Sequence, residues 1–77
     1  MMDDDMFFMP VKTERSLTSR QRDVLSYLAK GLQNKEIAYE MNLSVATVKR
    51  HLVDIFLRLS VRTRTAAVVK AHKLGLI

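Results

Sequence analysis

The sequence predicts an all-α fold, a four-helix bundle that contains a helix-turn-helix and is preceded by a flexible N-terminal arm. Apolar residues recur at helical spacing in four segments, and a residue suited to cap a helix precedes each one. The chain is 48% hydrophobic but only 6% aromatic, which favours a helical core of Leu, Val, Ile and Ala. Its 77 residues allow one small domain, near the size where a single core is only marginally stable.

The first helix is expected to begin at Thr18, because Thr18 and Gln21 have the spacing of a capping box. Gly31 supplies the left-handed residue that commonly ends a helix. The apolar stripe of this first helix consists of Val24, Leu25, Leu28 and Ala29. Residues 1–16 show neither helical nor strand periodicity, and Pro10 disfavours a helix there. We therefore expect residues 1–16 to form an arm or linker.

The segment from Asn34 to His51 has the pattern of two short helices joined by a tight turn. Asn34 is the expected N-cap of the first of them, and Asn42 tolerates the left-handed conformation of a helix stop. Ser44 can cap the next helix, whose apolar face begins at Val48. The apolar face of the first helix consists of Ile37, Ala38 and Met41. This arrangement predicts a helix-turn-helix.

The next helix, around residues 45–59, has two different faces. Steps of 100° per residue place one set inward: Val48, Leu52, Ile55 and Leu59. The outward set is Ala46, Arg50, Val53 and Leu57, with Lys49 on the flank. Arg and Lys can donate to guanine in the DNA major groove, and an apolar side chain can contact a thymine methyl group. A solvated surface with a few stray charges explains the periodicity about equally well.

The last helix is expected to be capped by Thr63 and to run through Lys73, before Gly75. Three residues should face inward: Ala67, Ala71 and Leu74. A second strip on the opposite side consists of Thr65, Val69 and His72, and Leu76 is a candidate fourth member. A partly apolar strip on the outer side of a terminal helix suggests a partner surface, although scattered apolar surface residues are common.

Charge is distributed unevenly along the chain. Residues 1–16 carry four acidic and two basic side chains, so the remainder holds 11 basic and four acidic ones, a net charge of +7. Such an excess attracts polyanions, although charge alone is weak evidence for nucleic-acid binding. The helix-turn-helix pattern strengthens that interpretation.

Several classes of protein are disfavoured. The chain has no cysteine, and neither His51 nor His72 has a metal ligand at a suitable interval, so we expect no metal and no other cofactor. No set of residues suggests nucleophilic or acid–base catalysis, which argues against an enzyme. No apolar run is long enough to span a membrane, and the acidic start is unlike a signal peptide. We therefore expect a cytoplasmic protein.

From Leu17 to about His72, the sequence resembles the LuxR-type (GerE-, FixJ- or NarL-like) helix-turn-helix domain. Specific blocks carry the likeness: LTSRQ, NKEIA, TVKRH, RLSV and RTAAV. The resemblance implies that residues 17–77 form a four-helix DNA-binding domain that dimerises through its last helix. It implies a transcriptional regulator, either stand-alone or the output domain of a larger protein, that binds inverted-repeat half-sites in double-stranded DNA as a weak homodimer. RNA polymerase is a further candidate partner, and the resemblance implies association with the bacterial nucleoid.

The resemblance also assigns roles to residues. The base-contacting positions of the family match Lys49, Arg50 and Val53. Positions near the phosphate backbone match Lys35, Thr47, His51, Arg62 and Arg64. The dimer surface corresponds to the strip Thr65, Val69 and His72.

Three residues depart from the family pattern. Gln21 stands where many members have Glu, and Ser60 stands where Gly is usual before Val61. Val53 stands where many members carry a long polar or basic side chain, which shifts base readout towards methyl contact or weakens it.

Two other functions use a related helix-turn-helix. The first is a protein-interaction adaptor that uses the same scaffold to bind polymerase or another regulator, but retained basic residues such as Lys49 and Arg62 favour DNA. The second is a promoter-recognising segment of a sigma factor, which the sequence of the last helix argues against.

Overall fold

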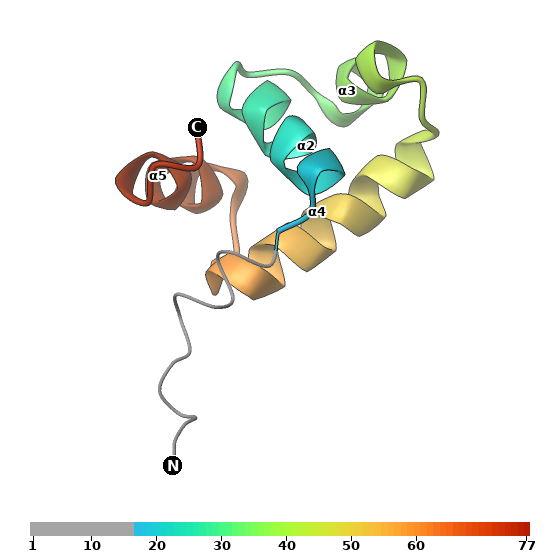
Figure 1. The fold of residues 1–77 in the computed structure, drawn as a ribbon. Coiled ribbons are helices and arrows are strands. Elements are labelled where there is room, and N and C mark those ends of the chain that lie inside the picture. Colours follow the sequence, from blue (N-terminus) through green and yellow to red (C-terminus); the bar gives the residue numbers. More distant parts are fainter. Residues whose placement is uncertain (1–16) are drawn as a thin grey trace.

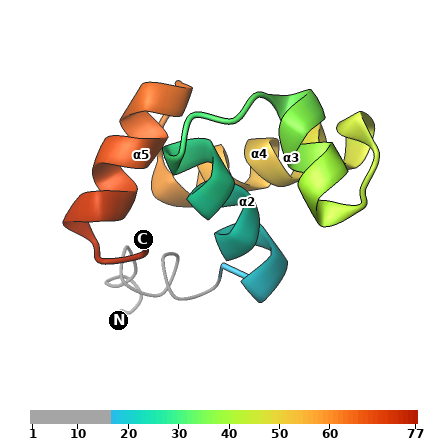
Figure 2. The ribbon, with the colours of Figure 1, turned by 90° about the horizontal axis from the view of Figure 1, so that it is seen from above.

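The computed structural model describes residues 17–77, which form four α-helices and no strand. In chain order these are α2 (Ser19–Ala29), α3 (Asn34–Met41), α4 (Val45–Leu59) and α5 (Arg64–Lys73). The longest helix, α4, runs beneath α2 and α3 (Figure 1). Seen from above, α2 lies between α3 and α5 (Figure 2). The all-α prediction is confirmed, whereas the predicted arm 1–16 lies outside the described residues.

All four helices contribute to one hydrophobic core. From α4 it takes the predicted set Val48, Leu52, Ile55 and Leu59. From α2 it takes Val24, Leu25 and Leu28, while Ala29 is only half-buried. The residues of α5 in the core, Ala67 and Ala71, are small, and α5 contacts both α2 and α4. Burial of these apolar stripes is the main free energy that holds the helices together.

Side chains close the start of three helices as the sequence predicts. Thr18 Oγ1 accepts from the Gln21 backbone N–H, and Gln21 Oε1 accepts from the Thr18 N–H, both at 3.0 Å. Ser44 Oγ accepts from the Thr47 backbone N–H at 3.0 Å at the start of α4. At the start of α5, Thr63 Oγ1 accepts from the Ala66 backbone N–H at 3.0 Å. Each bond satisfies a backbone donor that the first helical turn leaves without a partner.

The predicted capping role of Asn34 is wrong. Asn34 is the first residue of α3, and the N-cap is Gln33 in extended conformation. The Gln33 backbone N–H donates to Glu36 Oε1 at 2.7 Å, so a glutamate within the first turn closes this end. The Asn34 side chain is free for a tertiary contact described below.

Within residues 17–77, four residues with positive φ end the helices or turn the chain after them. They are Gly31 at 90°, Asn42 and Ser60 at 57°, and Gly75 at 70°. Gly31 and Asn42 were predicted to take this role. Ser60 adopts the left-handed conformation at the C-cap of α4 even though it is not glycine, at a cost of about 1 kcal/mol.

The predicted inward position of Leu74 is also wrong. Leu74 is the C-cap of α5 and is 37% exposed. The Leu76 N–H donates back to the Ala71 carbonyl at 2.9 Å, so the chain reverses beyond the helix. Leu76 and Ile77 are half-buried and pack against the core instead, so the expected place of Leu76 in the outer strip of α5 is wrong. The reversal at Gly75 therefore brings later residues to the place predicted for Leu74.

Candidate nucleic-acid interface

The turn between α3 and α4 sets the position of α4. Asn42 ends α3 in the left-handed conformation, and the Leu43 N–H then donates to the Ala38 carbonyl at 2.9 Å. Ala38 is buried, and its small side chain lets α4 approach α3 closely. Arg20 Nη2 donates to the Met41 carbonyl at 3.2 Å, which ties the end of α3 to α2. These contacts hold the two helices as one rigid helix-turn-helix.

The first turn of α4 carries a pair of hydroxyl groups at its exposed end. The Ser44 hydroxyl donates to Thr47 Oγ1 at 2.9 Å, and Ser44 Oγ accepts from the Thr47 backbone N–H. Thr47 therefore keeps its own hydroxyl proton for an external acceptor. Such a donor beside the positive end of a helix is suited to an anionic oxygen.

Five exposed residues form the outer face of α4: Ala46, Lys49, Arg50, Val53 and Leu57. Val53 is 57% exposed and Leu57 is 71% exposed, so both apolar side chains meet solvent in the described part of the chain. Two of the predicted base-contacting residues, Arg50 and Val53, thus face away from the buried stripe, and Lys49 lies exposed on the flank of the same face. His51 is half-buried on a different side of α4. This face combines hydrogen-bond donors with apolar surface.

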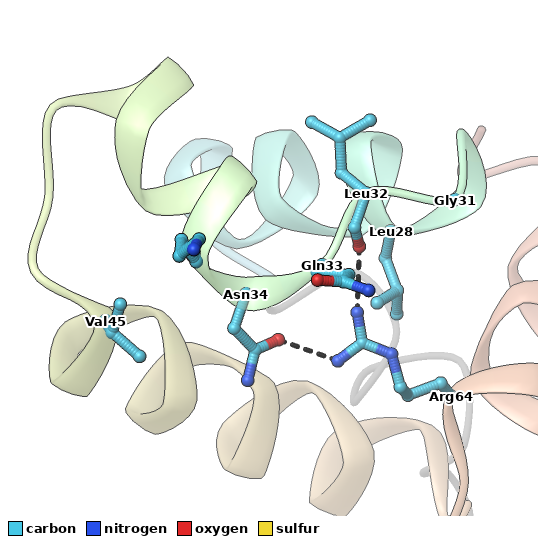
Figure 3. A pocket seen from close by; sticks show the side chains of 8 residues that line it. Leu28, Gly31, Leu32, Gln33, Asn34, Val45 and Arg64 are labelled. Atoms are coloured by element: carbon cyan, nitrogen blue, oxygen red, sulfur yellow. Dashed lines mark hydrogen bonds between the residues drawn. The ribbon is translucent and has the colours of Figure 1, made fainter.

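Arg64, the first residue of α5, makes a tertiary contact that sequence reasoning missed. Arg64 Nη1 donates to Asn34 Oδ1 at 2.7 Å, and Nη2 donates to the Leu32 carbonyl at 2.9 Å (Figure 3). The two bonds join the start of α5 to the connection between α2 and α3. A guanidinium has five N–H donors, so Arg64 keeps others available. The partners are some 30 positions apart, and no local pattern indicates such a contact.

The same region contains an open cleft of about 460 Å³. Its lining includes Val45 from α4 and Arg64 from α5 (Figure 3). Lys35 from α3 also lines it. Two predicted phosphate-contacting residues therefore line one cleft beside the start of α4. Arg62 is exposed just before α5. The residues that line this cleft include two basic side chains, Lys35 and Arg64, and no acidic one. This positive charge favours an anionic partner.

The predicted dimer strip lies on the exposed side of α5. Thr65, Val69 and His72 are all exposed, and Val69 is 51% exposed. Their spacing places them on one side of the helix, away from the buried Ala67 and Ala71. The structure thus provides a separate surface for the predicted partner contact.

Two features are absent from residues 17–77. No helix in this range is long and apolar enough to cross a membrane. The range also contains no group of three or more His, Cys, Asp or Glu side chains arranged to hold a metal ion.

Residues 15–71 match the family model GerE, described as bacterial regulatory proteins of the luxR family. The chain is 49% identical over 53 residues to the nitrate/nitrite response regulator protein NarP of Escherichia coli, covering 69% of this chain and 25% of that protein. It is 42% identical over 62 residues to the transcriptional regulatory protein LiaR of Bacillus subtilis, covering 80% of this chain and 29% of LiaR.

The fold has a matching relative among solved structures. The response regulator ChrA of a heme-sensing two-component system superposes with a TM-score of 0.79 at 42% identity, over 80% of this chain and 31% of ChrA. The chain therefore spans between a quarter and a third of the length of these relatives.

The four-helix arrangement and the helix-turn-helix define a helix-turn-helix domain of the kind found in transcriptional regulators. The chain belongs to the LuxR family of bacterial regulatory proteins.

Proposed function

We propose that this chain binds double-stranded DNA sequence-specifically and regulates transcription, as a stand-alone protein or as the output domain of a larger regulator. The outer face of α4 carries the proposal. It presents Lys49, Arg50 and Val53 on a rigid helix whose opposite side is packed in the core. A helix is narrow enough to enter the major groove, where such side chains meet base edges.

We assign contacts with the phosphate backbone to five other residues that have basic or hydroxyl side chains. These are Lys35, Thr47, His51, Arg62 and Arg64. Lys35 and Arg64 line the cleft beside the start of α4, and the hydroxyl of Thr47 has a proton to donate. Contacts to phosphate position the protein on DNA but carry no direct sequence information.

Salt dependence is the decisive test of DNA binding. If two modules make about 6–10 phosphate contacts, affinity should fall about 10³- to 10⁵-fold between 50 and 200 mM salt, because counterions are released on binding. Fluorescence anisotropy with a labelled duplex measures this. Lys35→Ala should make the slope shallower, whereas Arg22→Ala, which removes the same charge from an exposed residue of α2, should not. A DNA affinity that does not change with salt concentration would contradict the proposal.

We also propose that two copies pair through Thr65, Val69 and His72 on α5. One recognition helix covers few base pairs, and a single module buries too little surface for tight specific binding. Two modules related by a two-fold axis would bind half-sites about one helical turn apart. The strip is short, so the dimer should be weak and should form mainly on DNA.

Val69→Glu tests this pairing. The change puts a charge into an apolar contact and opposes like charges across the two-fold axis, so paired-site affinity should fall about 10- to 100-fold. Single half-site affinity and circular dichroism should not change, because Val69 is exposed. Gel shifts with paired and single half-sites measure the difference. Unchanged paired-site binding by the folded variant would remove α5 from the interface.

A further inference from the structure

The outer face of α4 contains more apolar surface than a contact with phosphate requires. Ala46, Val53 and Leu57 are all exposed and share one stripe of the helix with Arg50. Single exposed apolar residues are normal on protein surfaces, so exposure alone assigns no partner. Here, however, Lys49 and Arg50 lie immediately beside Val53. The two cations favour an anionic partner that also offers an apolar group.

Val53 is the residue of this stripe best placed to read a base. It lies four positions after Lys49, about 6 Å along the helix axis, which corresponds to about two base-pair steps. Its side chain has no hydrogen-bonding group and a stiff χ1 angle, so ordering it costs little entropy. Against an adenine, guanine or unmodified cytosine edge, Val53 would leave polar atoms without partners.

One group on the major-groove edge suits such a side chain. The C5-methyl group of thymine projects into the major groove, and 5-methylcytosine carries the same group at the same ring position. We propose that Val53 recognises the C5-methyl group of a pyrimidine, at a base pair next to those contacted by Lys49 and Arg50. Because this rests on the proposed function of the α4 face, the test separates the two.

The test begins with selection of a preferred site from random duplexes by the whole chain. Each thymine in one half-site is then replaced by deoxyuridine, which removes only the methyl group. At one position, affinity should fall about three- to fivefold, the effect of one buried methyl group. At that position a 5-methylcytosine·guanine pair should likewise bind more tightly than an unmethylated one.

Val53→Ala should abolish the difference between thymine and deoxyuridine at that position. Leu57→Ala is the matched control, since Leu57 is the more exposed residue one turn further along the same face, and it should retain the difference. A specific site with no deoxyuridine effect, or an effect that survives Val53→Ala, overturns methyl recognition by Val53. Failure of any preferred site to emerge would instead count against the proposed function itself.

Discussion

The inward and outward faces of α4 are interleaved in the sequence but have opposite physical roles. Inward residues such as Ile55 are fully buried, whereas Leu57, only two positions later, is 71% exposed. Adjacent residues such as Val48 and Lys49 likewise lie on different faces. A helix turns by about 100° per residue, so neighbours in sequence separate in space. Stability and binding should therefore respond to different substitutions within one helix.

The largest expected effect comes from the inward face. Ile55→Ala should reduce the free energy of unfolding by about 2–5 kcal/mol, because it removes buried methyl groups and leaves a cavity in the core. Urea denaturation followed by circular dichroism measures the loss. Leu57→Ala is the control and should change stability by about 0.5 kcal/mol or less. Equal effects of the two substitutions would break the distinction between the faces.

A smaller effect, on binding alone, is expected from the outward face. Lys49→Ala should cost about 1–3 kcal/mol on the preferred site and relax selectivity at one base pair. Lys35→Ala should weaken binding to preferred and random DNA about equally, since a phosphate contact does not distinguish sequences. Competition binding with both duplexes separates these results. If Lys49→Ala lowered both affinities equally, the assigned roles would be wrong.

The smallest effect concerns the residue at which α4 ends. Ser60→Gly should raise stability by about 1 kcal/mol, because glycine adopts positive φ without the steric cost that a Cβ imposes. In a domain of this size, the melting temperature should rise by about 4–8 °C. Asn42→Gly is the matched comparison and should gain less, since asparagine tolerates this conformation better. DNA affinity should not change, and a lower melting temperature for Ser60→Gly would contradict the strain argument.

Most of the local structure could be predicted from short-range patterns. The capping residues Thr18, Ser44 and Thr63 act as predicted, and Asn42 has positive φ. These features depend on residues within a few positions of one another, so a single sequence contains the necessary information. The buried stripe of α4 was predictable for the same reason, because helical periodicity alone selects it.

The candidate site was predictable in part. The exposed positions of Lys49, Arg50 and Val53 on one face agree with the helical pattern. Their contacts with bases, and those of the other assigned residues with phosphate or a second copy, stay predictions. The cleft shared by Lys35 and Arg64 could not be predicted, because it joins residues from helices far apart in the sequence.

The sequence by itself determined the four helices, the turn between α3 and α4, and the division of α4 into a buried and an exposed face. Only the tertiary structure decided that Asn34 and the Leu32 carbonyl hold Arg64, and that Leu76 packs on the core while Leu74 stays partly exposed. The physical reason is the range of the interactions. Caps and periodicity act within one or two turns of helix, whereas these contacts exist only after the helices have packed and the chain has reversed.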